Sequence, residues 1–287
     1  MTTLPDSFSD FLENGCDRCR FILDRLAVRG ITGQIVTLGM QRHIVVQFAP
    51  RFYNPLFKLK TVITHYDRVF GSPGANDNSA AVFQIIDWVE RLNKARRFHN
   101  VRIFFTDGEE LGGEEGVREQ GAFGIASRFK ALGILNDDVY VFDCCGRGDV
   151  FVLSATGVRN AGNQAFNHRF TGLYHRTEDL LRLAAPDRWV SVPVPYSDNA
   201  GFLACGIPAV AITLLPAPEV SAYLGELRRD KKLETDMLNH DMKAQERLPE
   251  TWRLLHTPED NAGSLTPKSF AHMARLLDTL TIQKDLR

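Results

Sequence analysis

Residues 59–78 read LKTVITHYDRVFGSPGANDN, a buried-strand pattern that runs into a polar turn. The apolar, β-branched run up to Thr64 is typical of a strand covered on both faces of a sheet. His65 and Asp67 stand at its end, and the glycines of PGANDN allow a sharp turn toward a helix at 80–92. The stretch therefore predicts a strand, a turn and a helix, with polar side chains gathered at the carboxyl end of the strand.

Two later stretches, VRIFFTD at 101–107 and DVYVFDC at 138–144, repeat this buried-strand pattern and also end in or near acidic residues. Helical spacing at 117–132 separates them, so strands and helices alternate along the chain. Such alternation predicts a largely parallel sheet, which binds ligands at the carboxyl ends of its strands. We therefore expect an α/β fold with a mostly parallel, mixed central sheet and helices on both faces.

The remaining segments extend this architecture. Further helices are expected at 6–28, 160–184 and 267–280, and short strands at 32–40, 43–48, 188–194 and 207–215. Residues 219–251 are polar and highly charged, which predicts a helical insertion: a solvated arm or lid over the ligand site, a dimer arm, or an ordinary exposed helix. Because no repeat or linker divides the chain, we expect one domain over 1–287 that carries this insertion.

Composition argues against several classes of function. The 287 residues include 34 basic and 35 acidic side chains, which give a net charge of -1. This balance lacks the excess of positive charge that binding to nucleic acid or to an anionic membrane needs. The N-terminus lacks a signal-peptide pattern and no apolar run reaches a membrane span, so a cytoplasmic protein is expected. Five cysteines without framework spacing predict free thiols, including the CxxC pair Cys16 and Cys19.

Metal-competent side chains cluster in five short segments: HYD at 65–67, GANDN at 74–78, DGEELGG at 107–113, FDCCG at 142–146 and LLHTPEDN at 254–261. Imidazoles and carboxylates at strand ends suit a hydrolytic zinc site with open positions for water and substrate. Any one of these residues alone is better explained as a capping, turn or core residue. Their joint occurrence is what favours a metal site.

In this order the segments resemble the co-catalytic di-zinc aminopeptidases of metallopeptidase clan MH, whose kin include aminoacyl carboxypeptidases and the single-zinc glutaminyl cyclases. The resemblance runs from about Lys60 to the C-terminal helix and includes SDNAGFLACGIPA at 197–209. It implies the zinc-exopeptidase fold, which is phosphorylase/hydrolase-like, and hydrolysis of N-terminal peptide bonds. It also implies peptide substrates with a free N-terminus and Zn²⁺ as the cofactor, as two ions or one.

The resemblance assigns roles residue by residue. His65 and Asp143 would bind one metal ion, and Glu110 and His256 would bind the other. The carboxylate of Asp77 would bridge the two ions. Glu109 would be the general base, a role typically worth about 10² to 10⁴ in rate. Asp67 would orient the imidazole of His65. Asp198 would lie near the substrate amine or, alternatively, cap a helix.

Three features depart from the family pattern. The loop GGEEGVREQGAFG at 112–124 is longer and richer in glycine than usual, which predicts a different pocket wall. Asn199 stands where the family often has histidine. Leu255 precedes the metal histidine where the secreted aminopeptidases carry a tyrosine that helps to hold the oxyanion.

Alternative functions stay open at this point. One is cyclisation of N-terminal glutamine, although GANDN and DGEELG resemble the peptidases more closely than the cyclases. Another is an N-acyl amino acid hydrolase or carboxypeptidase, in which Arg147 or Arg169 would anchor a substrate carboxylate. A non-catalytic binding relative is disfavoured, because five ligands and the base are all present. The side-chain preference is not indicated, and a homo-oligomer is an open expectation.

Overall fold

The computed structural model describes residues 4–112, 116–156, 163–239 and 241–286. Across these residues eight strands form one sheet, in the spatial order β1-β2-β4-β3-β5-β8-β6-β7. In chain order the strands are β1 (Gln34–Leu38), β2 (Gln41–Val46), β3 (Lys60–His65), β4 (Val101–Thr106), β5 (Asp138–Phe142), β6 (Val150–Ser154), β7 (Trp189–Val192) and β8 (Ala209–Leu215). The strand predicted within 59–67 is β3, which lies in the interior of the sheet.

The middle of the sheet is parallel. Strands β4, β3, β5 and β8 run in the same direction. The β1–β2 hairpin joins β4 in antiparallel fashion, and β6 joins β8 in the same way. All residues of β3, β4 and β5 are buried. The prediction of a mostly parallel, mixed sheet is confirmed.

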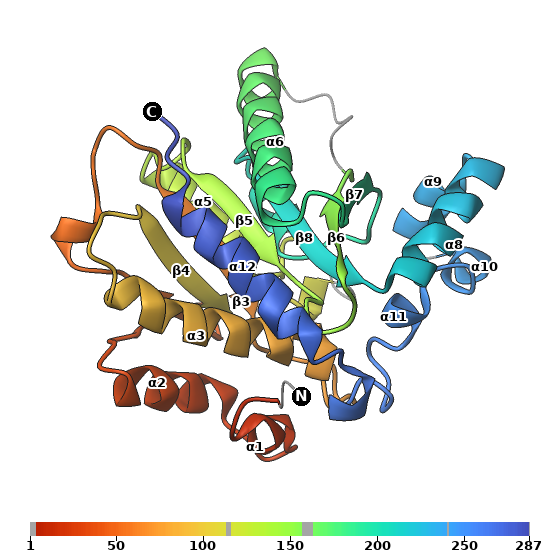
Figure 1. The fold of residues 1–287 in the computed structure, drawn as a ribbon, viewed down its shortest axis with the longest axis horizontal. Helices are drawn as coiled ribbons and strands as arrows, with labels where there is room; N and C mark the ends of the chain where they lie inside the picture. Colours follow the sequence, from red (N-terminus) through yellow and green to blue (C-terminus); the bar gives the residue numbers. More distant parts are fainter. Residues whose placement is uncertain (1–3, 113–115, 157–162, 240, 287) are drawn as a thin grey trace.

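Successive side chains of β3 enter two different cores, as a strand covered on both faces requires. Val62 packs in a larger core and Ile63 in a smaller one. Five helices contribute to the larger core: α1 (Phe8–Leu12), α2 (Arg18–Val28), α3 (Ala80–Asn93), α6 (Gln164–Ala184) and α12 (Lys268–Ile282). The smaller core is closed by α5 (Gly121–Ala131) and α7 (Asn199–Ala204). Figure 1 shows α3 and α12 lying across one face of the sheet.

The polar stretch at 219–251 folds into short helices: α8 (Ala217–Arg229), α9 (Leu233–Leu238), α10 (Met242–Gln245) and α11 (Glu250–Arg253). They gather to one side of β6 and β7 (Figure 1). These helices are not solvated throughout, since Tyr223, Met237 and Trp252 pack with Val152 and Val192 in a third core. The high charge of the segment conceals these few apolar side chains, which helical spacing brings onto one face.

Several predicted helices begin or end at other residues in the structure. The helix predicted over 6–28 is divided into α1 and α2, because Asp17 caps a new helix by accepting a hydrogen bond from the backbone N–H of Arg20 at 3.1 Å. The helix predicted over 117–132 begins only at Gly121, and residues 160–162 of the predicted 160–184 helix lie outside the described residues. All five cysteines are free thiols, as predicted.

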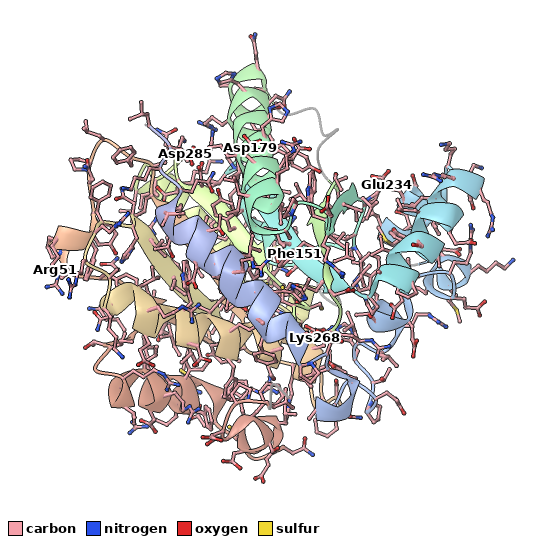
Figure 2. The ribbon with its side chains drawn as sticks, viewed as in Figure 1. Arg51, Phe151, Asp179, Glu234, Lys268 and Asp285 are labelled. Atoms are coloured by element: carbon pink, nitrogen blue, oxygen red, sulfur yellow. The ribbon has the colours of Figure 1, made fainter. Side chains whose placement is uncertain are left out.

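Apolar side chains lie mainly inside the molecule, and charged side chains lie mainly on its surface. Phe151 of β6 lies inside the molecule and is 1% exposed, whereas Asp179 and Lys268 project from helix surfaces (Figure 2). Within the described part of the chain, no helix combines the length and the apolar character that a membrane span needs.

Candidate metal centre

Three of the predicted site segments meet because their strands are neighbours. His65 ends β3 and lies opposite Thr106, the last residue of β4, in the parallel register. The glutamates at 109–110 follow β4 within a few residues, and Asp143 follows β5 directly. Since the carboxyl ends of parallel strands share one edge of the sheet, these side chains converge there.

Asp77 reaches the same edge through the turn before α3. Gly74 adopts a left-handed φ of 64°, and a Cβ at this position would lie 2.6 Å from the carbonyl oxygen of Asp77, so only glycine fits. The buried carboxylate of Asp260 accepts hydrogen bonds from the backbone N–H groups of Asn76 at 2.7 Å and Asp77 at 3.1 Å. These contacts hold the turn in place. Asp260 belongs to the segment LLHTPEDN, but no role was predicted for it from the sequence.

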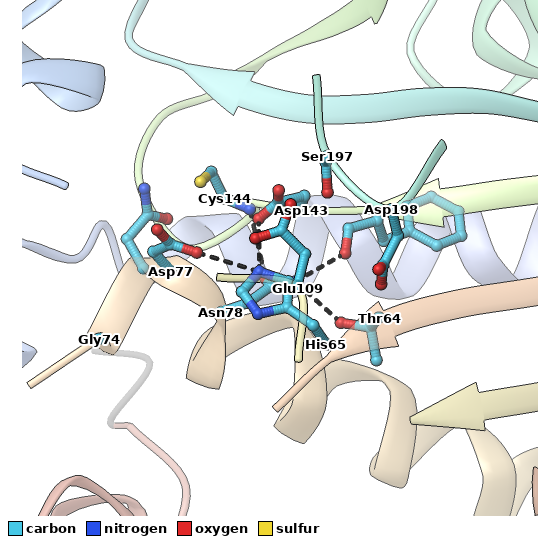
Figure 3. A network of polar contacts seen from close by, with 12 residues as sticks. Thr64, His65, Gly74, Asp77, Asn78, Glu109, Asp143, Cys144, Ser197 and Asp198 are labelled. Atoms are coloured by element: carbon cyan, nitrogen blue, oxygen red, sulfur yellow. Dashed lines mark hydrogen bonds and ion pairs between the residues drawn. The ribbon is translucent and has the colours of Figure 1, made fainter. Parts of the chain in front are cut away.

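The two oxygens of Asp77 face two different histidines. Oδ1 lies 3.1 Å from Nε2 of His65, and Oδ2 lies 3.2 Å from Nε2 of His256. Asp143 approaches His65 to 3.5 Å, and Glu110 approaches His256 to 3.1 Å. The result is two groups of three potential ligands that share Asp77, and within each group the ligand atoms lie within 4.8 Å of one another. Figure 3 shows His65 between Asp77 and Asp143.

All five predicted ligands are therefore brought together, and their electrostatics are unusual. Hydrogen bonds to Asp77 and Glu110 raise the pKa of His256 to about 11. Burial opposes charge on His65, yet Asp143 and the other carboxylates nearby raise its pKa well above the ordinary value. Burial also opposes ionisation of Asp77, but hydrogen bonds from both histidines outweigh it and lower the pKa of this carboxylate.

The remaining carboxylates show an excess of buried negative charge. Burial raises the pKa of Glu110 to about 7 and that of Glu109 well above its ordinary value. Oε1 of Glu110 and Oδ1 of Asp143 are buried and have no hydrogen-bond partner within the described residues. A bound cation would offset this charge and occupy these oxygens, so the donor set fits a divalent metal. Its mix of imidazole and carboxylate suits zinc.

Asp67 connects the two halves of this centre. Its carboxylate accepts hydrogen bonds from the backbone N–H groups of Glu109 at 3.2 Å and Glu110 at 3.1 Å. The same carboxylate lies 3.4 Å from Nδ1 of His65. Asp67 is thus placed to orient both the imidazole and the loop that carries the two glutamates, which is the geometry that its predicted role needs.

Asn78 is a structural residue of the site that sequence reasoning missed. Its amide donates to Thr64 Oγ1 and to the carbonyl of Phe142, both at 3.0 Å, and its Oδ1 accepts from the backbone N–H of Cys144 at 3.3 Å. It therefore ties the turn to the ends of β3 and β5 (Figure 3). The signal available in the sequence was the pair of amides that flank Asp77 in GANDN.

Asp198 is buried and is not among the residues that line the cavity described below. Its side chain is fully buried and Oδ2 accepts a hydrogen bond from Thr106 Oγ1 at 2.5 Å. Burial raises the pKa of Asp198 to about 7. It makes no side-chain cap on α7, so the helix-capping alternative has no bond to support it. Its predicted contact with a substrate amine stays a prediction.

A cavity of about 320 Å³ opens onto the metal centre. Its polar side includes the carboxylates of Asp77, Glu109, Glu110 and Asp143. The rest of its lining is largely apolar and includes Val117, Val194, Met237, Leu238, Trp252 and Leu255. Among the described residues, no lysine or arginine lines it. The cavity therefore combines a negatively charged end with an apolar body.

The two arginines considered as carboxylate anchors have other partners. Arg147 lies 3.5 Å from Glu219 and 3.4 Å from Glu250 and also donates to the carbonyl of Ser264. Arg169 donates to the carbonyl of Gly206 at 3.4 Å. Neither side chain lines the cavity.

Comparisons with known proteins agree with this architecture. The model of a family described as Peptidase family M28 matches residues 58–281. The Legionella pneumophila LapA aminopeptidase aligns over 96% of this chain and 69% of its own, with 15% identity and a TM-score of 0.63. The Bacillus subtilis zinc aminopeptidase BSAP aligns over 83% and 49%, with 15% identity and a TM-score of 0.57. The Tannerella forsythia glutaminyl cyclase aligns over 97% and 98%, with 15% identity and a TM-score of 0.63. No curated protein sequence matches significantly.

Proposed function

This chain belongs to peptidase family M28, and we propose that it is a zinc-dependent aminopeptidase that removes the first residue from peptides with a free N-terminus. The observation that carries the proposal is the pair of ligand groups that share Asp77, set beside Glu109 in an acidic cavity. A site for two ions next to a carboxylate that is not itself a proposed ligand is the arrangement that metal-assisted hydrolysis requires.

His65 and Asp143 would hold one zinc ion, and Glu110 and His256 the other, with Asp77 between them. Zinc in this position supplies a water of lowered pKa and polarises the scissile carbonyl. The protein holds the ligands rigidly, because Asp67, Asn78 and Asp260 anchor the segments that carry them. Such supporting contacts set both the orientation and the basicity of metal ligands.

Glu109 is proposed as the general base. It lines the cavity, and its backbone N–H donates to Asp67 Oδ1 at 3.2 Å, which fixes the loop that carries it beside the proposed metal ligands. In this position it accepts a proton from the attacking water and returns it to the leaving amine. Burial raises the pKa of Glu109, which makes its carboxylate more basic than an exposed glutamate, as a proton-accepting role requires.

The lining of the cavity weighs against a substrate carboxylate. Zinc ions held by Asp77, Glu110 and Asp143 would offset most of the carboxylate charge, but no described lysine or arginine lines the cavity to pair with a C-terminal carboxylate. The partners of Arg147 and Arg169 further weigh against a carboxypeptidase. We propose that the apolar wall, to which α9 and α11 contribute Met237, Leu238 and Trp252, receives the side chain of the first residue. In this respect 219–251 acts as a cavity wall.

The test is hydrolysis of matched substrates that differ only at the N-terminus. Peptides of one sequence are offered with a free amine, with an acetylated amine and with N-terminal glutamine, each with added zinc and with a chelator. The proposal predicts release of the first amino acid from free peptides only, lost with the chelator and in Glu109→Gln. Cyclisation of glutamine without hydrolysis would identify a cyclase, and cleavage of only the acetylated series would identify an acylase. A cytoplasmic location and a homo-oligomeric state stay predictions.

A further inference from the structure

The residue before α5 is a glutamine, Gln120, which lies against the general base. Nε2 of Gln120 donates a hydrogen bond to Oε1 of Glu109 at 3.0 Å, and Gln120 is only 5% exposed. We propose that Gln120 is a positioning residue, which holds the Glu109 carboxylate in the direction needed for proton transfer. This inference rests on the proposed function, because it concerns the base of that reaction.

Two glycines, Gly112 and Gly121, leave room for Gln120 to lie close to Glu109. A Cβ at Gly121 would lie 1.8 Å from the carbonyl oxygen of Asp107, so only glycine allows α5 to begin directly against the β4 loop. The N–H of Gly121 donates to the carbonyl of Gly108 at 3.0 Å and fixes this contact. On the other side, a Cβ at Gly112 would lie 3.2 Å from Cβ and Nε2 of Gln120. The side chain of Gln120 is thus confined beside Glu109.

Helix capping does not account for Gln120. It occupies the N-cap position of α5, but its side chain makes no capping hydrogen bond. Its one described side-chain hydrogen bond is the bond to Glu109. Its Oε1 is buried and has no hydrogen-bond partner within the described residues, so the bond to Glu109 is the polar contact that orients the side chain.

The chemistry of an amide suits the role. In the ionised form that a general base needs, a carboxylate only accepts hydrogen bonds, so the NH₂ group of Gln120 is the end of the amide that suits it. A lysine or arginine in this place would form an ion pair and reduce the basicity of Glu109. A neutral amide restrains the carboxylate without taking its charge, and it leaves the second oxygen free to receive a proton.

The first experiment compares Gln120→Met with Gln41→Met. Methionine keeps the length of glutamine but cannot donate, and Gln41 holds the same loop from outside by donating to the carbonyl of Glu119 at 2.8 Å. We expect Gln120→Met to lower kcat about 10- to 100-fold, the range for loss of a hydrogen bond to a charged group, with KM changed less than about 3-fold and zinc content unchanged. Gln41→Met should change kcat less than about 3-fold. Equal losses in both variants would mean that only loop stability matters, which overturns the proposal.

A double-mutant cycle and a measurement without catalysis complete the test. In the Glu109→Asp variant the shorter side chain no longer reaches the amide of Gln120. Adding Gln120→Met to that variant should therefore lower kcat by less than about a further 2-fold. If the two substitutions lower kcat independently, the two side chains are not coupled and the proposal fails. The side-chain amide ¹⁵N resonance of Gln120 should shift in Glu109→Ala, and an unmoved resonance would refute the contact. If the wild-type protein cleaves no peptide, the proposed function fails, while this resonance still decides whether Gln120 holds Glu109.

Discussion

Replacing Arg18 with methionine should loosen the loop that carries Asp67 and weaken zinc binding. Arg18 lies in α2, outside the residues matched by the family model. Its guanidinium donates to the carbonyls of Tyr66 and Pro73, both at 2.9 Å, and more distantly to that of Asp67 at 3.5 Å. It therefore joins both ends of the loop between β3 and Gly74. Burial lowers the pKa of Arg18 to about 10, so the group stays charged at neutral pH.

The magnitude follows from the bonds that would be lost. A hydrogen bond from a charged donor contributes about 1.5 to 3 kcal/mol. The carbonyl of Pro73 keeps a second donor in Arg68, also at 2.9 Å, so the main loss is at the buried carbonyl of Tyr66. We expect the free energy of unfolding to fall by about 2 kcal/mol, which corresponds to roughly 4 °C in Tm. Because Asp67 supports a ligand and both glutamates, zinc affinity should fall about 10-fold.

The assay measures both quantities on matched variants. Thermal unfolding of the zinc-free protein gives the change in Tm, and competition with a chromogenic chelator gives the zinc affinity. Arg20→Met is the control, since Arg20 lies on the same helix, its side chain is 72% exposed and among the described residues its ion pair is with Asp24 at 3.0 Å. That variant should change stability by less than about 0.5 kcal/mol.

Two results would contradict the reasoning. Equal Tm and zinc affinity in Arg18→Met and Arg20→Met would show that the loop keeps its conformation without the guanidinium. A lower Tm with unchanged zinc affinity would show that Arg18 stabilises the fold but does not position the site.

Three further predictions test the remaining assignments. Glu109→Gln should abolish turnover while zinc content, measured by atomic emission, stays that of the wild type; full activity would remove Glu109 from the mechanism. His256→Ala should lose about one equivalent of metal, because this imidazole faces Asp77 and Glu110, and an unchanged metal content would break the ligand assignment. Burial lowers the pKa of Lys60 to about 7, below its value of 10.5 in the unfolded chain, so the unfolded state binds the extra proton between these pH values. The contribution of Lys60 to the free energy of unfolding is therefore smallest below pH 7 and rises with pH. Between pH 7 and pH 9, the free energy of unfolding of the wild type, measured with denaturant, should increase by about 2 kcal/mol relative to that of Lys60→Met. No relative increase would mean that Lys60 stays protonated in the folded protein.

The sequence by itself determined those features that depend on neighbours along the chain. A buried strand that ends in His65, a glycine turn before Asp77 and a strand that ends beside Asp143 are local patterns. Alternation of strands and helices then places all strand ends on one edge, so the shared location of the site could be predicted as well. The order of the motifs was enough to identify the family, which the match over 58–281 confirmed.

Only the tertiary structure decided which residues support that site and what surrounds it. Asp260 reaches the N–H of Asp77 from 183 residues away, and Arg18 reaches the carbonyl of Tyr66 from 48 residues away. The sequence allowed 219–251 to be predicted as a lid over the site, but it did not show that Met237 would line the cavity, because which apolar side chains face the cavity depends on what they pack against. Hydrogen bonding and packing between distant segments depend on the folded path of the whole chain, and no local pattern of residue types encodes that path.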